Sequence, residues 1–375
     1  MLLLAPSQGL SGGIERYLAA VEDTLRAGGA DVHRFDLLTA DTTLTPSTRA
    51  GYALRTLSAA RRLGTVDSVV VGHVNLALLG SVVTRLTGAR QMPVLFYGND
   101  IWGMRRGLRP VLRRDGLLLP VTISSFSAGA LATLGRPAIV PPNIAAPWRD
   151  RLLAEGMRRR PLPPVPTVLS VFRLSQWRTK GLPELVEAVA AVRRDLGPVR
   201  LIIAGNGPAP GALHELVAAA EDTELHESPD DDTLARLYAT ADLFALCTRT
   251  RTRPPFSGEG FGIVLLEAQL AGCAVVGPAS GGSHDAYQNG VTGLRPLDET
   301  PQALARVLTE MLSDRARLAR MGRQAAEWAR MYTDPASYAR LVFSTFTGSP
   351  LPPKGEKGEL RVPAQGAPAE TPARA

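Results

Sequence analysis

The sequence predicts an α/β protein of two doubly wound domains, each with a parallel sheet covered by helices on both faces. Short apolar runs typical of buried strands alternate with stretches that carry apolar residues at helical spacing along nearly the whole chain. The alternation pauses once, in a proline- and arginine-rich stretch at 141–166. The length of 375 residues, 45% of them apolar, gives each half enough apolar residues for its own core.

Twelve apolar runs are predicted strands, six in each half. They are 2–5, 32–35, 68–72, 93–97, 121–123 and 138–140, then 168–171, 200–204, 225–227, 243–246, 274–277 and 293–295. The helices predicted between them include 14–27, 124–133, 182–194 and 261–271. We expect ligands at the carboxyl ends of these strands, in a cleft between the two domains.

The domain boundaries are predicted from composition. A first domain covers 1–145, a stiff Pro/Arg-rich linker covers 146–166, and a second domain covers 167–333. From 348 to 375 proline, glycine, alanine and charged residues dominate without apolar periodicity, so we expect a disordered tail there.

Charge and cysteine usage narrow the class of protein. The net charge of +7 fits an anionic small molecule, a membrane surface or nucleic acid, and does not choose among them. Two cysteines, Cys247 and Cys273, make no disulfide framework or zinc pattern, so we expect the reducing cytoplasm. We find no apolar run long enough to span a membrane and no signal peptide at residues 1–6.

Two features suggest sites for a phosphate group. Gly12 and Gly13 stand between the first strand and a helix, where backbone amides can approach a phosphate, although a plain turn explains them equally well. Arg173 and Lys180 follow the first strand of the second half. Lys180 is the only lysine before residue 354, which favours a compact point charge for a diphosphate over solvated surface charge.

Two glutamates flank the glycine-rich start of the helix predicted at 261–271. Glu259 lies in the preceding loop and can point into the cleft, and the residues between, Gly260, Phe261, Gly262 and Ile263, offer amides to an anion. Glu267 lies in an otherwise apolar helix. Because a buried helix rarely tolerates an unpaired carboxylate, we expect a partner for Glu267, such as ribose hydroxyls.

Polar residues also leave two strands of the first half. His73 ends a buried strand and is either functional or structural. The turn Tyr97-Gly98-Asn99-Asp100 follows the next strand and is either a tight turn or part of a site.

Two motifs are weaker than they look. The run from Gly205 and Asn206 to Gly211 loosely resembles a dinucleotide fingerprint, but its spacing is off by one and two prolines remove amides. Residues 230–232, three aspartates before a helix, are interpreted as a helix cap rather than a metal site. No His, Cys or carboxylate cluster has metal-ligand spacing.

Taken in order, these residues resemble the retaining glycosyltransferases of family 4, which have the GT-B fold, over roughly residues 1–347. The motifs that carry the resemblance are Gly12-Gly13-Ile14-Glu15, Arg173 with Lys180-Gly181, residues 204–208, Glu259 and Glu267 with seven residues between them, Gly281-Gly282, and residues 289–293.

The resemblance implies transfer of a sugar from a nucleotide diphosphate sugar to a hydroxyl acceptor, with retention, no essential metal and no cofactor. It implies that Arg173, Lys180 and Gly13 bind the diphosphate. Glu259 would then contact the donor sugar and Glu267 the ribose. The base would be bound by Gly205, Asn206 and residues 226–232. It also implies that a helix at 334–347 crosses back to the first domain.

One departure concerns catalysis. The family usually has a histidine where this chain has Tyr97. We expect Asp100 and His73 to make the polar contacts to the transferred sugar, with Tyr97 lining the pocket, because a phenol is a poor proton acceptor at neutral pH. The alternatives are an epimerase, a non-catalytic sugar-nucleotide-binding protein and, more remotely, a nicotinamide oxidoreductase.

A basic stretch concerns the acceptor. Arginines at 105, 106, 109, 113 and 114 alternate with apolar residues, which suggests an anionic membrane surface that presents a lipid-linked acceptor. A solvated basic face or an anionic acceptor groove explains the same pattern. We therefore expect a cytoplasmic protein, peripheral at the inner face of the membrane, that binds no nucleic acid.

Overall fold

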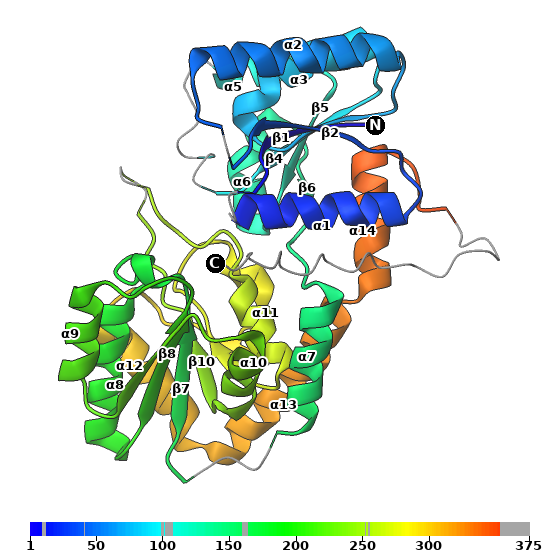
Figure 1. The fold of residues 1–375 in the computed structure, drawn as a ribbon. Coiled ribbons are helices and arrows are strands. Elements are labelled where there is room, and N and C mark those ends of the chain that lie inside the picture. The colour runs from blue at the N-terminus through cyan, green and yellow to red at the C-terminus, as the bar shows by residue number, and fades with distance from the viewer. Residues whose placement is uncertain are drawn as a thin grey trace, which may run out of the picture.

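The computed structural model contains two lobes, each built on a six-stranded parallel sheet (Figure 1). It describes residues 1–9, 13–40, 42–98, 101, 108–159, 164–251, 253 and 256–352. The sheet orders are β2-β1-β3-β4-β5-β6 and β12-β11-β10-β7-β8-β9. The predicted fold class is confirmed.

All twelve predicted strands are present. In the first lobe they are β1 (Leu2–Ser7), β2 (His33–Leu38), β3 (Val69–Val71), β4 (Met92–Phe96), β5 (Leu118–Thr122) and β6 (Ala138–Ile139). In the second they are β7 (Thr167–Val171), β8 (Arg200–Gly205), β9 (Thr223–Glu227), β10 (Leu243–Ala245), β11 (Ala274–Val276) and β12 (Gly293–Leu294). Most residues of the central strands are apolar because helices cover both of their faces.

Helices of the first lobe lie on opposite faces of its sheet (Figure 1). They are α1 (Gly13–Ala27), α2 (Pro46–Leu63), η1 (Val74–Leu76), α3 (Ala77–Thr87), α5 (Leu108–Arg113), α6 (Ser125–Leu131) and η2 (Ala132–Leu134). Helix α1 packs on Leu3, Val70 and Leu95 of one face, whereas α2, α3 and α5 pack on Leu4, Val71 and Val94 of the other. Alternate residues of the strands thus supply two separate cores.

The second lobe follows the same pattern. Its helices are η3 (Leu174–Gln176), α8 (Leu182–Leu196), α9 (Gly211–Ala219), α10 (Asp231–Thr240), α11 (Ile263–Leu270), η4 (Gly282–Ala286), α12 (Pro301–Ser313) and α13 (Arg315–Tyr332). Helices α8 and α12 share one core with β7, β8 and β11. No helix among the described residues is both long and apolar enough to cross a bilayer.

Two helices connect the lobes. Helix α7 (Ala146–Met157) lies inside the stretch 146–166 that we predicted as a stiff linker. Pro147 does not interrupt this helix because it occupies the first turn, where its missing amide would have had no partner within the helix. Helix α14 (Pro335–Thr347) returns to the first lobe, where Phe343 packs on Gly28 and the Thr345 carbonyl accepts from Gln91 at 3.2 Å. The predicted crossover helix is confirmed.

The chain stays ordered slightly beyond α14. Leu351 packs against Gly28 in the first core, inside the segment 348–375 that we expected to be disordered. Residues 353–375 lie outside the described residues, and the exact domain boundaries remain a prediction.

The lobes meet at the carboxyl ends of their strands. A Cβ added to Gly260 would lie 2.7 Å from the Tyr97 carbonyl oxygen, which follows β4. One added to Gly282 would lie 2.4 Å from the Ser124 hydroxyl, which follows β5. Small residues are therefore required where the loops of the two lobes touch.

A matched pair of glycines tests the packing of the first lobe. In α3, a Cβ on Gly80 would lie 2.4 Å from Val71 Cγ2, whereas in α6 a Cβ on Gly129 would meet nothing within 4 Å. We expect Gly80→Ala to lower the free energy of unfolding by about 1–3 kcal/mol through overpacking. Gly129→Ala should raise it by about 0.5–1 kcal/mol because alanine favours helix. Chemical denaturation measures both, and equal stability of Gly80→Ala and wild type would contradict this packing.

Candidate functional site

An ion pair joins two of the predicted site residues. Lys180 Nζ lies 2.8 Å from Glu259 Oε2, and the Thr248 hydroxyl donates to the same oxygen at 2.7 Å. The side chains of Lys180 and Glu259 are 20% and 13% exposed, so the pair is largely shielded yet accessible. A ligand can therefore approach the ammonium of Lys180 with little screening of its charge by solvent.

Glycine positions Lys180 beside the end of β10. Gly181 has a left-handed backbone (φ 72°), and a Cβ there would lie 2.0 Å from the Cys247 carbonyl oxygen. The amide of Arg249 also donates to the Thr179 carbonyl at 2.9 Å. These contacts bring the loop after β7 against the loop after β10, and so bring Lys180 to Thr248.

The loop before α11 holds Glu259 at the junction of the lobes. Gly262, the residue before α11, has a left-handed backbone (φ 78°), and the Phe261 ring is buried and stacks on Tyr332 with centroids 6.3 Å apart. Gly260 lies against Tyr97 of the first lobe. The predicted glycine-rich start of this helix therefore faces the other lobe, as a site between lobes requires.

Glu267 finds its partners within the protein. The Trp148 indole donates to Oε1 at 3.0 Å, and the Tyr238 hydroxyl donates to Oε2 at 2.9 Å. Burial raises the pKa of Glu267, while the two hydrogen bonds lower it. The carboxylate thus has partners, as we expected of a buried glutamate, and α7 and α10 supply them from positions far away in the sequence. The ribose role of Glu267 remains a prediction.

The other predicted donor residues surround the ends of β7 and β8. Arg173 is exposed directly after β7, and its side chain has no hydrogen bond or ion pair with the described residues. Gly205 is required by packing, since a Cβ would lie 1.8 Å from the Phe172 carbonyl oxygen. The Asn206 carbonyl accepts from the Leu174 amide at 3.2 Å. Arg173 and Gly205 thus belong to adjoining loops.

The loop after Gly205 does not function as a dinucleotide fingerprint. The amide of Gly207 donates to the Ser228 hydroxyl at 3.0 Å, and that of Ala209 donates to Glu227 Oε2 at 2.6 Å. Because side chains already occupy these amides, they are not free for a pyrophosphate. Asp230 accepts from the Thr233 amide at 2.7 Å and caps α10, which confirms the capping interpretation.

Two residues of the first lobe stack at the ends of β3 and β4. The rings of His73 and Tyr97 lie 6.3 Å apart and nearly parallel, and the Tyr97 hydroxyl donates to the Gly72 carbonyl at 3.0 Å. His73 Nδ1 accepts from the Asn75 amide at 3.2 Å. In a neutral imidazole this contact places the proton on Nε2. Asp100, the third residue of this prediction, lies outside the described residues.

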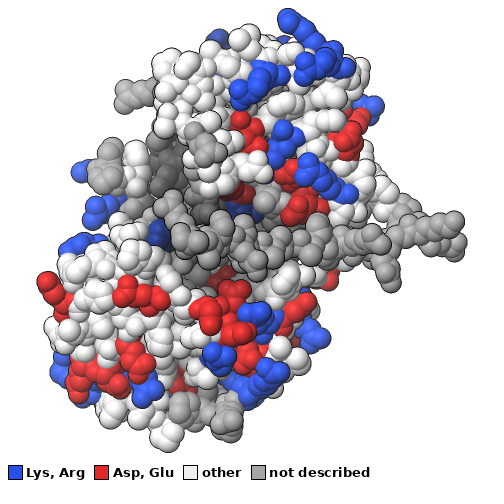
Figure 2. All heavy atoms as spheres, viewed as in Figure 1, with Lys and Arg blue, Asp and Glu red and all other residues white. Residues whose placement is uncertain are grey.

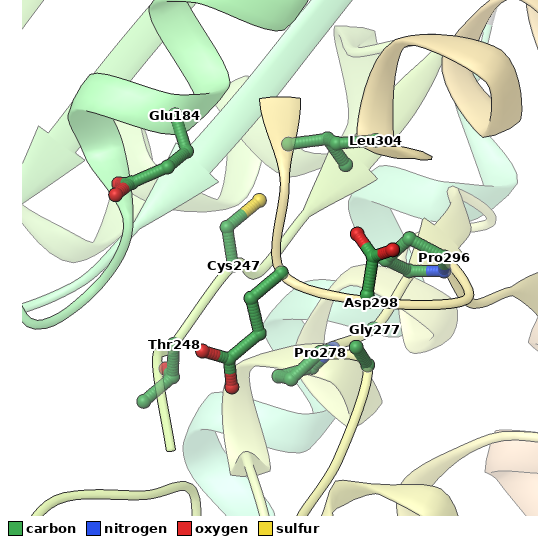
Figure 3. A pocket seen from close by; sticks show the side chains of 10 residues that line it. Glu184, Cys247, Thr248, Gly277, Pro278, Pro296, Asp298 and Leu304 are labelled. Carbon is green, nitrogen blue, oxygen red and sulfur yellow. The ribbon is translucent and has the colours of Figure 1, made fainter. Parts of the chain in front are cut away.

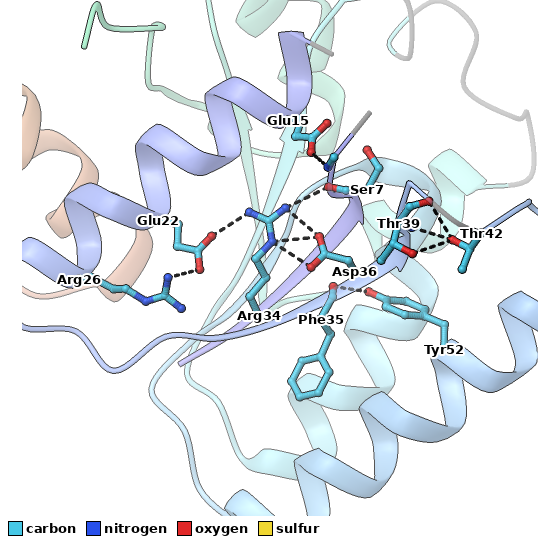
Figure 4. A network of polar contacts seen from close by, with 11 residues as sticks. Ser7, Glu15, Glu22, Arg26, Arg34, Phe35, Asp36, Thr39, Thr42 and Tyr52 are labelled. Atoms are coloured by element: carbon cyan, nitrogen blue, oxygen red, sulfur yellow. Dashed lines mark hydrogen bonds and ion pairs between the residues drawn. The ribbon is translucent and has the colours of Figure 1, made fainter. Parts of the chain in front are cut away.

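An ion cluster fixes helix α1 at the same end of the first sheet (Figure 4). Arg34, which is 10% exposed, donates to Glu22 on α1 and to Asp36 on β2, both at 2.8 Å, and to the Ser7 carbonyl at 3.0 Å. Glu15 on the first turn of α1 accepts from the Gly9 amide. These contacts attach α1 to β1 and β2, and a Cβ on Gly13, its first residue, would meet nothing within 4 Å. Gly12 lies outside the described residues.

A contact between the lobes was not predicted. The amide and the hydroxyl of Ser125, at the start of α6, both donate to the Asp285 carboxylate at 2.5 Å. The sequence shows only that each of the two residues is polar and follows a buried strand of its own lobe. That pattern is too common to identify this pair.

A pocket in the second lobe lies beside this site rather than in it (Figure 3). Its lining includes Cys247 and Thr248 and three acidic residues, Glu184, Asp298 and Glu299. Arg249 pairs with Glu184 and Glu299. The acidic lining disfavours an anion, so the pocket does not fit a diphosphate.

The burial of Glu267 predicts how stability depends on pH. Because its pKa is raised in the folded state, wild type loses stability as pH increases from the usual carboxyl range through the folded pKa. Glu267→Gln lacks this loss and keeps an oxygen for Trp148. We expect its free energy of unfolding, relative to wild type, to increase from acidic to neutral pH. Denaturation across that range tests this, with the exposed Glu310→Gln as control, and a decreasing difference would contradict the expectation.

Comparison with known proteins identifies the family of this chain. The family model described as "Glycosyl transferases group 1" matches residues 159–328. A "GDP-mannose-dependent alpha-(1-6)-phosphatidylinositol monomannoside mannosyltransferase" of Mycobacterium tuberculosis is 32% identical over 325 residues, which cover 82% of this chain and 81% of the relative. A "D-inositol 3-phosphate glycosyltransferase" of Corynebacterium glutamicum is 31% identical over 53% of this chain and 48% of the relative.

A solved structure agrees on the fold. The Anabaena protein Alr3699/HepE, crystallised with UDP and glucose, superposes with a TM-score of 0.65 and 18% identity over 93% of this chain and 99% of its own. Together these findings show that the chain belongs to the group 1 glycosyl transferases, of family 4 type, and is a GT-B enzyme that transfers a sugar from a nucleotide-sugar donor.

Proposed function

We propose that the chain is a retaining, metal-independent mannosyltransferase that uses GDP-mannose and an inositol-containing phospholipid as acceptor. The observation that carries this proposal is its similarity to the mannosyltransferase of M. tuberculosis along four fifths of both chains. The cytoplasmic face of a membrane is the proposed location, which such an acceptor favours. A soluble inositol phosphate is the second candidate acceptor, which the relative from C. glutamicum supports.

The ion pair of Lys180 supports a role in holding the diphosphate. A leaving diphosphate gains negative charge in the transition state, so a shielded ammonium beside it lowers the barrier. Lys180 is positioned by Glu259 and Thr248 and needs little reorganisation. Arg173, which lacks a partner among the described residues, is proposed to add a second cation, and Gly13 to bring the start of α1 close to the same group.

The remaining donor contacts are proposed from the same loops. Glu259 keeps one carboxylate oxygen, Oε1, outside the bonds to Lys180 and Thr248, and this oxygen is proposed to accept from hydroxyls of the donor sugar. Residues 260–263 would lie against that sugar through their backbone. Glu267 is proposed to bind the ribose through lone pairs that Trp148 and Tyr238 leave free. Gly205, Asn206 and residues 226–232 would surround the base.

Retention is proposed to follow from attack on the same face of the sugar. A leaving phosphate oxygen accepts the proton of the acceptor hydroxyl, so no protein nucleophile is needed. The first lobe then positions the sugar, with His73 Nε2 donating to a sugar hydroxyl, Tyr97 lining the site and Asp100 offering a carboxylate.

Replacement of Lys180 tests the diphosphate role. We expect Lys180→Ala to lose at least about 100-fold in kcat/KM, about 2.7 kcal/mol, whereas EDTA leaves kcat/KM unchanged. Arg178→Ala is the matched control, since this exposed arginine is two residues before Lys180 in the sequence and its guanidinium lies 3.9 Å over the Trp177 ring. Steady-state transfer from radiolabelled GDP-mannose measures these effects. Full activity of Lys180→Ala would remove Lys180 from the site, and loss of activity in EDTA would remove metal independence.

A second set of variants tests the sugar-binding face. We expect His73→Ala to lower kcat by about 100-fold while the affinity for GDP stays nearly constant, because the nucleotide contacts are proposed on the other lobe. Tyr97→Phe should have a smaller effect, since it keeps the ring that lines the site and loses the hydroxyl that donates to the Gly72 carbonyl. Titration calorimetry with GDP and turnover assays separate the two quantities. If Tyr97→Phe is inactive while His73→Ala keeps full turnover, the proposed roles are reversed.

A further inference from the structure

Two hydrogen bonds hold the carboxylate of Glu267 from outside its own helix, one on each oxygen. Trp148 of α7 donates to Oε1 at 3.0 Å, and Tyr238 of α10 donates to Oε2 at 2.9 Å. The donors lie 119 and 29 residues away in the sequence. Because hydrogen bonds weaken steeply as their angle changes, rotation of the carboxylate would weaken both bonds together. The orientation of Glu267 is therefore determined by α7 and α10.

Helix α7 has a fixed place on the second lobe, beside α10 and α11 (Figure 1). A Cβ on Gly156 would lie 2.9 Å from the Leu270 carbonyl oxygen, so α7 packs directly on the end of α11. Arg151 also pairs with Asp232 of α10 at 2.9 Å. Figure 2 shows acidic and basic side chains intermingled on the face where α7 and α10 lie. The indole of Trp148 is thus presented to Glu267 by a well-anchored helix.

Glu267 keeps room for a ligand. The side chains at 265, 266 and 268–270 of α11 are buried, whereas Glu267 is partly exposed. A carboxylate has about four lone-pair sites, and the bonds from Trp148 and Tyr238 use about one on each oxygen. The remaining sites are divided between the two oxygens, which suits two adjacent hydroxyls, as in the 2′,3′-diol of a ribose.

We propose that Trp148 and Tyr238 are positioning residues that orient Glu267 toward the 2′- and 3′-hydroxyls of the donor nucleotide. Each acts through the oxygen of Glu267 that it holds, because a carboxylate held in advance needs little reorganisation when the diol binds. The inference rests on the proposed ribose role of Glu267 and names the residues on which that role depends. The alternative is packing alone, since Trp148 contacts the apolar core and Tyr238 is fully buried in it.

Phenylalanine variants separate orientation from packing, because they keep an aromatic ring and remove the donor. The quantity measured is the ratio of the affinities for GDP and for 2′,3′-dideoxy-GDP, by titration calorimetry. We expect wild type to bind GDP at least about tenfold more tightly, since the diol donates to a charged group. Trp148→Phe and Tyr238→Phe should each lower this ratio at least about threefold, through weaker binding of GDP, while the affinity for the dideoxy analogue stays constant.

The same apolar core supplies matched controls. Trp328 and Tyr338 are partly buried against it, as Trp148 is, and the Tyr338 hydroxyl has no hydrogen-bond partner among the described residues. Trp328→Phe and Tyr338→Phe should keep the wild-type ratio. Glu267→Gln should lower the ratio, and Trp148→Phe added to it should lower the ratio no further, because Trp148 acts through that carboxylate. An unchanged melting temperature shows that a variant is folded.

The outcomes distinguish this inference from the proposed function. Losses confined to Trp148→Phe and Tyr238→Phe support it, and if one of them fails to fold, the other tests the same carboxylate. A wild-type ratio in both, with a lowered ratio in Glu267→Gln, overturns the inference and keeps the ribose role. Equal losses in the controls overturn it in favour of packing.

A wild-type ratio in Glu267→Gln removes the ribose role and the inference with it. Repeating the comparison with UDP and its dideoxy analogue makes the result independent of the proposed base. Because only binding is measured, the result is also independent of mannose transfer.

Discussion

The contact of Lys180 with Glu259 is the constraint on which the proposed donor site depends. It joins two charged residues 79 positions apart at the carboxyl edge of the second sheet, with Thr248 as the third member. Each loop reaches this contact only because glycine allows it: Gly181 passes against the Cys247 carbonyl, and Gly262 turns the chain into α11. Any side chain at Gly181 or Gly262 would separate the charges of Lys180 and Glu259, since both glycines have positive φ and close neighbours.

The same edge also holds the two lobes together. Gly260 and Gly282 touch Tyr97 and Ser124 of the first lobe, and Asp285 accepts two hydrogen bonds from Ser125. The loops proposed to bind the donor therefore also make the contacts between the lobes. Any change that opens the lobes moves Gly260, next to Glu259, away from the stacked rings of His73 and Tyr97. In this arrangement, opening of the lobes is coupled to release of a ligand bound between them.

The sequence was most informative where the physics is local. Unbroken apolar runs predicted the buried strands, such as β3, β4 and β11, because burial on both faces leaves no alternation to misread. The stretch 146–166 was predicted as a linker because the prolines at 161–166 exclude a helix there, but α7 precedes them, and its Pro147 stands in the first turn, where proline is tolerated. The partners of Glu267 and the tautomer of His73 depend on contacts between distant segments, or on the local backbone, which composition and spacing do not encode.

A crystal structure of the chain with intact GDP-mannose tests the central claim most directly. The account predicts diphosphate oxygens within hydrogen-bond distance of Lys180 Nζ and sugar hydroxyls on Glu259, at the junction with His73. The same placement with another nucleotide sugar would change the donor but keep the site. A diphosphate bound elsewhere, such as in the pocket beside Cys247, with Lys180 and Glu259 touching no ligand atom, would contradict it.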